Sequence, residues 1–239
     1  MSISGKFYKE LRIFMSCTLF IMDFTCFKAK IGKKEHLEQL QKEGIVYCNT
    51  LKYFTQVEDG QIRGDVHENA FDFKTFDKPR LQIKPANDPD ATFKDVNVTW
   101  VQMVTRNSEP YGNLYCLYCV DMTDVGSQGQ ISVAENNKDF GSHVLVFLNS
   151  EKFEERLYKE LKKRNLKYHF GHVSYIDLKK LSGRKTLFQK DTKYSYQNEF
   201  RIFIENAIQD TLILKLGDLS DISIIYEFDT FKQLYYKRP

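Results

Sequence analysis

Apolar residues follow two different periods along the chain. Between 71 and 104 they alternate with polar residues and are interrupted by three prolines, which is typical of β-hairpins with a loop around 87–90. Few stretches have the three- to four-residue spacing of an amphipathic helix. Further extended segments are predicted at 27–30, 45–48, 114–120, 143–148, 172–176, 199–205, 211–216 and 222–228. Strands are therefore expected to outnumber helices.

Two helices are predicted from the spacing of leucine and phenylalanine. Segment 33–43 places leucines on one face, and Gly44 is a natural helix stop. In 151–165 apolar residues recur every fourth position, and Ser150 is a suitable N-cap. Because consecutive strands often lack a helix between them, we predict an α+β fold with a mixed, largely antiparallel sheet and a few flanking helices.

The composition is typical of a water-soluble globular chain, with 42% apolar and 28% charged residues among 239. No shift in composition marks a linker, so we expect one domain over 26–239, after an N-terminal extension or strand over 1–25. The uncharged run 13–22 resembles part of a signal peptide, but it is too short to cross a bilayer and no small-residue cleavage site follows it. Five irregularly spaced cysteines favour the cytoplasm. We therefore expect no export and no membrane partner.

Three groups of residues have the types, but not the arrangement, of a metal site. Cys116 and Cys119 form a C-x-x-C within a predicted strand, where alternation sends the sulfurs to opposite faces. His169 and His172 suit a turn better than a helical metal pair. A polar loop without the pattern of a calcium-binding loop contains Glu58, Asp59, Arg63, Asp65 and Glu68. We predict no metal.

Charge is unevenly distributed along the chain. Ten basic and two acidic residues give segment 162–193 a charge of +8, which leaves −5 for the rest of a chain whose net charge is +3. Such a segment can attract phosphates, or it can form a solvated helix face and loop. Together with the acidic loop it supports an alternative function, a nucleic-acid-binding or metal-dependent nuclease module. A non-catalytic interaction protein is a second alternative.

The most informative segment is 194–203. Phosphate-loop, dinucleotide, nucleophile-elbow and zincin motifs are absent from the sequence. Here Glu199 opens an apolar strand, with Gln197 two residues before it and Arg201 two residues after it. Since alternate residues of a strand share a face, Arg201 can hold and orient the Glu199 carboxylate. A purely structural ion pair would have the same sequence pattern.

In this segment and at further positions, the chain resembles a widespread bacterial domain family that is described only as being of unknown function. The resemblance covers about residues 26–205 and includes an acidic loop reaching Glu68. Gln197 stands where the family often has an acidic residue. The other positions that carry the resemblance are segments 27–30, 45–54, 115–117, 140–147 and 173–175 and the Glu199-x-Arg201 strand.

Gln197-Asn198-Glu199 is also similar to the Q-x-E motif that ADP-ribosyltransferases place at the entrance of a strand. This resemblance implies an enzyme that consumes NAD, in which Glu199 stabilises the positive charge on the ribose as nicotinamide leaves. It implies that Gln197 positions the acceptor, a protein or nucleic acid. The resemblance to the bacterial family implies that such an effector acts in bacterial stress or phage defence. The NAD-binding positions that it implies are Lys28, Lys30, Asn49, Thr50, Tyr53 and Ser195.

Overall fold

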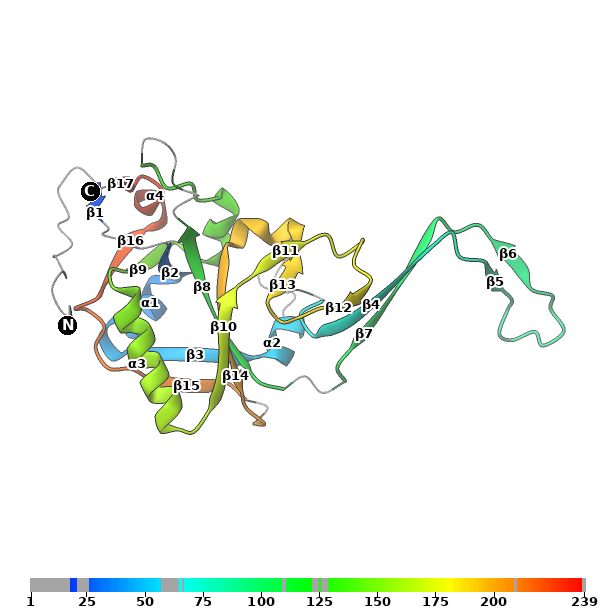
Figure 1. Cartoon of the computed structure of the whole chain (residues 1–239), viewed down its shortest axis with the longest axis horizontal. Coiled ribbons are helices and arrows are strands. Elements are labelled where there is room, and N and C mark those ends of the chain that lie inside the picture. The colour runs from blue at the N-terminus through cyan, green and yellow to red at the C-terminus, as the bar shows by residue number, and fades with distance from the viewer. Residues whose placement is uncertain are drawn as a thin grey trace, which may run out of the picture.

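A body formed around one large sheet carries a long hairpin arm (Figure 1). The computed structural model describes residues 18–20, 26–56, 65, 67–108, 111–121, 125, 129–208 and 210–237. Strand accounts for 42% of the structure and helix for 24%, which confirms the predicted α+β class. No helix among the described residues is long and apolar enough to span a membrane.

The large sheet has eight strands, and every pairing between them is antiparallel. Its main path runs in the order β10 (Lys167–His172), β14 (Glu199–Glu205), β8 (Asn113–Asp121), β2 (Cys26–Gly32), β9 (His143–Phe147) and β16 (Ser223–Glu227). Two further strands lie off this path: β3 (Ile45–Thr50), which pairs with β8, and β15 (Leu212–Lys215), which pairs with β3. The predicted strand 199–205 coincides with β14.

Strands β2 and β3 pair with β8 on the edge opposite β14, but at different ends of it. Residues 26–29 of β2 pair with 118–121, and the last two residues of β3 pair with Leu114 and Asn113. Among the described residues, 115–117 have no strand partner on this edge. The sheet is therefore split between β2 and β3, and this split positions the pocket described below.

Helices α1 (Lys34–Glu43) and α3 (Ser150–Lys163) bury their apolar faces in one core cluster with the sheet. As predicted, α1 stops at Gly44, whose φ of 62° favours glycine, and a Cβ there would overlap the backbone of Gly217. The predicted N-cap of α3 was wrong by one residue. Asn149 is the cap and accepts a hydrogen bond from the Lys152 N–H, while Ser150 lies in the first turn.

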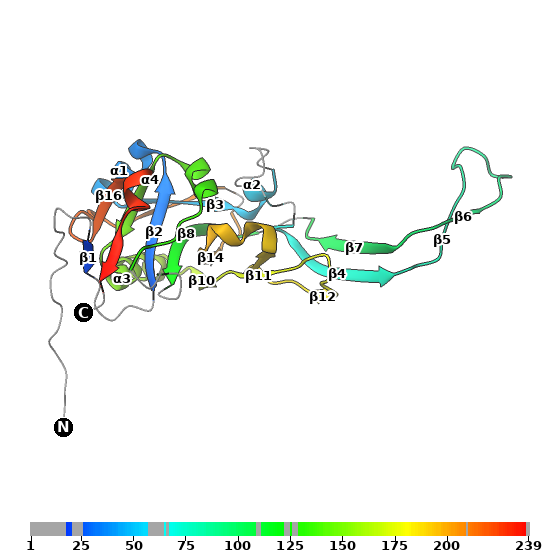
Figure 2. The same ribbon diagram turned by 90° about the horizontal axis from the view of Figure 1, so that it is seen from above.

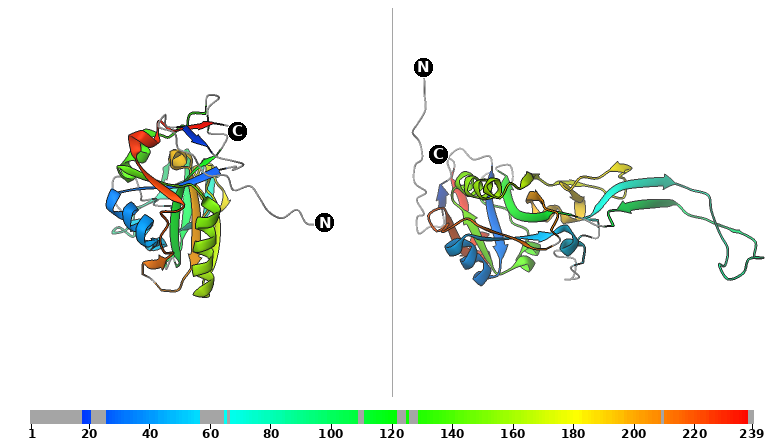
Figure 3. Two further views of the ribbon diagram at one scale, coloured as in Figure 1. Left: turned by 90° about the vertical axis from the view of Figure 1, so that its left-hand side faces the viewer. Right: turned by 90° about the horizontal axis from the view of Figure 1, so that it is seen from below.

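The arm consists of four strands that project from the body (Figure 2; Figure 3). The predicted hairpins over 71–104 are present as β4 (Ala70–Asp77), β5 (Leu81–Ile83), β6 (Lys94–Val96) and β7 (Trp100–Arg106). Strand β4 pairs with β7 along its length and with the short β12 (Gly183–Arg184) at its base.

Shorter elements complete the body. A second core cluster packs helix α4 (Phe228–Phe231) against the other face of the sheet. Helix α2 (Leu51–Gln56) follows β3, and two 3-10 helices are η2 (Glu135–Phe140) and η3 (Thr192–Gln197). Two parallel pairs join β11 (Ser174–Ile176) to β13 (Gln189–Asp191) and β1 (Thr18–Phe20) to β17 (Tyr235–Lys237). Of segment 1–25, the structure describes β1 alone.

Candidate functional site

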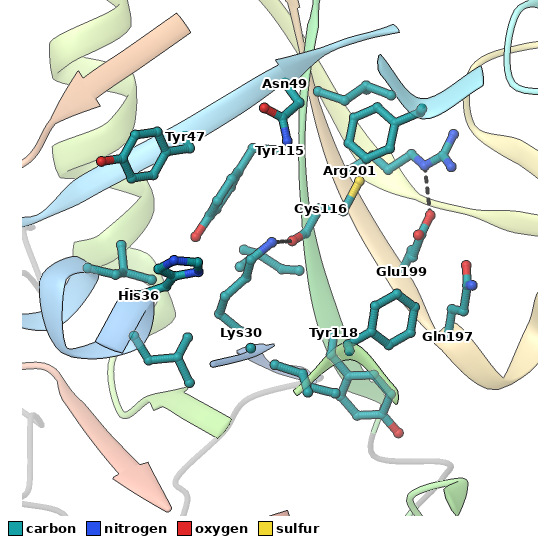
Figure 4. A pocket seen from close by; sticks show the side chains of 18 of the residues that line it. Lys30, His36, Tyr47, Asn49, Tyr115, Cys116, Tyr118, Gln197, Glu199 and Arg201 are labelled. Atoms are coloured by element: carbon teal, nitrogen blue, oxygen red, sulfur yellow. Dashed lines mark hydrogen bonds and ion pairs between the residues drawn. The ribbon is translucent and has the colours of Figure 1, made fainter. Parts of the chain in front are cut away.

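A cavity of about 720 Å³ opens where β2 and β3 separate along β8. Its size lies within the range of small-molecule binding sites. Residues from β2, α1, β3, α2, β8, η2, β13, η3, β14 and β15 line it. In Figure 4, Lys30 and His36 lie on one side of β8, and Gln197, Glu199 and Arg201 lie on the other. The cavity therefore extends from the split between β2 and β3, across β8, to β14.

One wall of the cavity is a buried network of charged side chains centred on β14. The predicted contact between Arg201 and Glu199 is present, with 2.8 Å between Arg201 Nε and Glu199 Oε2. The two terminal nitrogens of Arg201 donate to the two carboxylate oxygens of Glu68, at 2.6 and 3.0 Å. This two-pronged geometry is the strongest that an arginine and a carboxylate can form. Arg201 also donates to the Leu187 carbonyl.

Lys190 of β13 completes the network from the other side. Its ammonium donates to Glu199 Oε1 at 3.1 Å and to Gln197 Oε1 at 2.6 Å. Gln197 and Glu199 are therefore held side by side by one buried lysine. The sequence alone identifies Lys190 only as a member of the basic segment and does not predict this role. No local sequence pattern predicts the contact between Lys190 and Glu199, because η3 separates the two residues along the chain.

The network keeps its two carboxylates ionised. Burial by itself would raise the pKa of Glu199, but Arg201 and Lys190 outweigh it and lower this pKa to about 2. Burial likewise opposes ionisation of Glu68, whose pKa is nevertheless lowered, mainly by Arg201. Of the four side chains, Glu199 is the most exposed, at 13% compared with 4% or less for the others. Glu199 is thus the member best placed to meet a ligand.

Three other predicted residues line the same cavity. Lys30 donates to the Cys116 carbonyl at 2.6 Å, on the part of β8 without a strand partner, and its ammonium lies 4.5 Å from the centre of the Tyr115 ring. Asn49 accepts a hydrogen bond from the Thr211 hydroxyl. Tyr53 is partly exposed and packs edge-on against a neighbouring phenylalanine. The structure thus brings Lys30, Asn49 and Tyr53 to the cavity that Gln197, Glu199 and Arg201 also line.

Lys28, Thr50 and Ser195 are not among the side chains that line this cavity. Lys28 lies where β2 still pairs with β8, so it is covered by α3 and forms an ion pair of 2.6 Å with Glu154. The Thr50 hydroxyl accepts from the Tyr53 N–H and so closes the first turn of α2. Ser195 is an exposed residue of η3. Of the six positions that the resemblance implies for NAD binding, these three therefore lie outside the cavity.

The cysteine pair lies as strand alternation predicts. Cys119 belongs to the core cluster under α1 and α3, whereas Cys116 packs with the cluster on the opposite face of β8. Burial raises the pKa of Cys116 to about 11 and that of Cys48 to about 12, so both favour the thiol form. These properties are typical of structural cysteines rather than of a redox or zinc site.

The acidic loop and the two histidines have different locations. Glu58, Asp59 and Arg63 lie outside the described residues, while Asp65 is buried near Glu68. Over the described ranges, no group of three or more histidine, cysteine or acidic side chains can hold a metal ion. The prediction that His169 and His172 occupy a turn was wrong. Both lie in β10, where three-residue spacing sends them to opposite faces, and His169 contacts Glu205 at 2.9 Å.

The basic segment 162–193 does not form one uniform surface. Lys185 and Lys190 are buried, and Lys190 is part of the charged network. Three further members pair with acidic neighbours: Lys163 and Arg164 with Glu160, and Lys180 with Asp177. Five of the ten basic residues of the segment are therefore buried or paired with an acidic side chain.

The site thus combines an ionised carboxylate held by two cations, an amide beside it, and aromatic and cationic groups across an elongated cavity. Comparison of this chain with protein-family profiles, curated proteins and solved structures gave no match.

Proposed function

We propose that the cavity binds NAD and that the protein transfers ADP-ribose from it to an acceptor. The observation that supports this most is the position of Glu199, an ionised carboxylate in the wall of a cavity that Tyr53 and Lys30 also line. A fixed negative charge stabilises a ribose that becomes cationic as its bond to nicotinamide breaks. Each oxygen of Glu199 accepts one hydrogen bond in the network and so has a second acceptor site for a ribose hydroxyl.

In the proposed reaction, the bond between C1′ of the ribose and the nicotinamide nitrogen breaks, and nicotinamide leaves with the electron pair of that bond. A nucleophilic atom of the acceptor forms the new bond to C1′ and loses its proton to water. Glu199 has too low a pKa to remove this proton efficiently, so its role is electrostatic. Arg201 and Lys190 act as positioning residues that hold the carboxylate in place.

The other cavity residues have roles that follow from their locations. Gln197 is fixed beside Glu199 by Lys190 and would contact the acceptor. Tyr53, at the rim, would stack on the nicotinamide ring. Lys30, across β8 from Glu199, would contact the diphosphate, and Asn49 the remaining polar groups. The NAD contacts that we propose are therefore Lys30, Asn49 and Tyr53.

The test is release of nicotinamide from NAD labelled in the nicotinamide ring, with protein and nucleic-acid acceptors offered separately. We expect Glu199→Gln to reduce the rate by roughly 100- to 1,000-fold, the loss usually seen when one preorganised electrostatic group is removed. Glu205→Gln is the matched control, because Glu205 ends the same strand and is more exposed. It should keep the wild-type rate.

Folding and chemistry can be separated in this experiment. Glu199→Gln leaves Lys190 and Arg201 partly uncompensated, so its far-ultraviolet circular dichroism must match that of the wild type before rates are compared. Tyr53→Ala changes an exposed side chain and should weaken NAD binding in calorimetry without altering the fold. If the wild type neither binds NAD nor releases nicotinamide with any acceptor, or if Glu199→Gln is as fast as the wild type, the proposal is wrong.

A further inference from the structure

The hairpin arm exposes an unusual share of the molecule's large apolar side chains. Thirteen such side chains are exposed among the described residues, and seven belong to the arm: Phe71, Phe76, Leu81, Ile83, Phe93, Trp100 and Met103. The arm projects away from the body (Figure 1; Figure 2), and these seven side chains are 41% to 59% exposed. A two-stranded ribbon is only marginally stable in water, and an exposed apolar surface of this kind usually marks an interaction site.

The outer edge of β7 is an open template for another strand. β7 pairs with β4 on one side, and the described residues include no strand on its other side. Proteins usually protect such edges with charged residues, proline or a bulge. Residues 100–105 of β7 contain no charged residue and no proline, and the only irregularity in the β4–β7 pairing lies at the base, between Ala70 and Asp72. The edge is therefore both open and unprotected.

We propose that β7 pairs antiparallel with β7 of a second copy of this chain, which joins the two arms into a continuous sheet. A two-fold axis through Met103 pairs Met103 with its counterpart, Val101 with Thr105, and Gln102 with Val104. Apolar or neutral side chains then face one another along the seam. A two-fold dimer closes on itself and leaves no further open β7 edge, which avoids filament growth.

Charge complementarity supports this register. The same axis brings Arg106 of the second copy opposite Trp100, and both side chains lie on one face of the sheet. Trp100 pairs with Asp77 of β4 on its other side. The guanidinium would therefore lie over an indole ring and point towards a carboxylate, two contacts that arginine favours. Arg106, the last residue of β7, would thus favour this pairing instead of disfavouring it. This inference is independent of the proposed function.

Sedimentation velocity of the full chain over a wide range of concentrations tests the association. We expect a monomer–dimer equilibrium in the wild type and a monomer for Met103→Lys, which brings two positive charges together at the axis. Ile208→Lys is the control, because Ile208 is an exposed apolar residue of the body. It should dimerise as the wild type does. A wild type that stays monomeric would mean that any strand added to this edge comes from another protein, and it would overturn the proposal.

Disulfide trapping tests the register. Met103→Cys should form a covalent dimer under mild oxidation, since the two cysteines face each other across the axis at a separation that a disulfide can bridge. Val101→Cys alone should not, but a mixture of Val101→Cys and Thr105→Cys should. Wild type and Ile208→Cys measure the background from native cysteines and from random collision. If Met103→Cys cross-links no faster than Ile208→Cys, the proposed pairing is wrong, whatever the oligomeric state.

Discussion

Strands β14 and β7 are both seven residues long, yet they distribute charge and hydrophobicity in opposite ways. β14 lies between two strands of the large sheet and carries Glu199 and Arg201 into the buried interior. β7 lies at the edge of the arm and exposes Trp100 and Met103. Each strand therefore reverses the usual arrangement of charged residues outside and apolar residues inside.

The two reversals are compensated differently. In β14 the charges are balanced within the chain, by Glu68 from the end of the acidic loop and by Lys190 from β13. In β7 the side chains of Trp100 and Met103 stay exposed among the described residues, and on our proposal a second molecule covers this strand. Buried ion pairs seldom add net stability compared with well-packed apolar residues. Their presence in β14 is therefore better explained by the cavity that they border than by stability.

The largest effect is expected from breaking the charged network at its centre. Arg201→Met leaves two buried carboxylates, Glu68 and Glu199, without their main partner. We expect the free energy of unfolding to fall by about 3–5 kcal/mol, as measured by urea denaturation. Arg164→Met is the matched control. Arg164 is an exposed arginine that directly follows α3 and pairs with Glu160 of this helix. The control should lower the free energy of unfolding by less than about 1 kcal/mol. If both variants lower it equally, the buried network does not stabilise the fold more than an exposed ion pair does.

The second-largest effect is expected from acid, which weakens the network by protonating Glu199. The pKa of Glu199 is about 2 in the folded protein and near 4.5 when it is unperturbed. A lowered folded-state pKa stabilises the protein above the unfolded value, and this stabilisation is lost as the pH falls from about 4.5 towards 2. Between about pH 5 and about pH 2, the free energy of unfolding of the wild type should therefore fall by about 3 kcal/mol more than that of Glu199→Gln.

Denaturation curves at several pH values check this difference. Glu205→Gln should follow the wild-type pH dependence, because Glu205 lies outside the network. If Glu199→Gln and the wild type lose stability in parallel as the pH falls, the Glu199 carboxylate is not held as the structure indicates.

The next effect is expected on the reactivity of two thiols, Cys116 beside the network and Cys48 in the core cluster with α1 and α3. Because burial raises the pKa of Cys116 from 9.0 to about 11, its reactive thiolate should be roughly 100-fold scarcer at a pH below 9. For Cys48, with a pKa of about 12, the reduction should be roughly 1,000-fold. Iodoacetamide labelling followed by mass spectrometry should modify both residues slowly in the native protein and readily in urea. Equal rates in the two conditions would show that this part of the body opens freely.

The sequence allowed good prediction wherever the signal was local. Strand β14, the stop of α1 at Gly44 and the hairpins of the arm follow from periodicity and from single residues with strong preferences. The contact between Glu199 and Arg201 could also be predicted, because two residues on one face of a strand need no knowledge of the rest of the fold.

The rest depends on segments that are distant in sequence. Lys190 and Glu68 could not be assigned to the site because their contacts with β14 arise only when β13 and the loop before β4 pack against it. Lys28 and Lys30 are equivalent by alternation, yet only Lys30 lies beyond the point where β2 leaves β8. The split in the sheet decides which lysine reaches the cavity, and no local pattern encodes it.

The smallest effect is expected at the exposed face of the arm, where two phenylalanines of β4 provide a direct comparison. Phe76 is 43% exposed, whereas Phe73 is fully buried at the base of the arm and packs against His67. Phe76→Ala should change the free energy of unfolding by less than about 0.5 kcal/mol. Phe73→Ala, the matched control, should cost about 3–5 kcal/mol, because it leaves a cavity. Both are measured by urea denaturation at protein concentrations low enough to keep the chain monomeric. A large loss for Phe76→Ala under these conditions would mean that the chain itself covers this face, and the contrast between β14 and the arm would no longer hold.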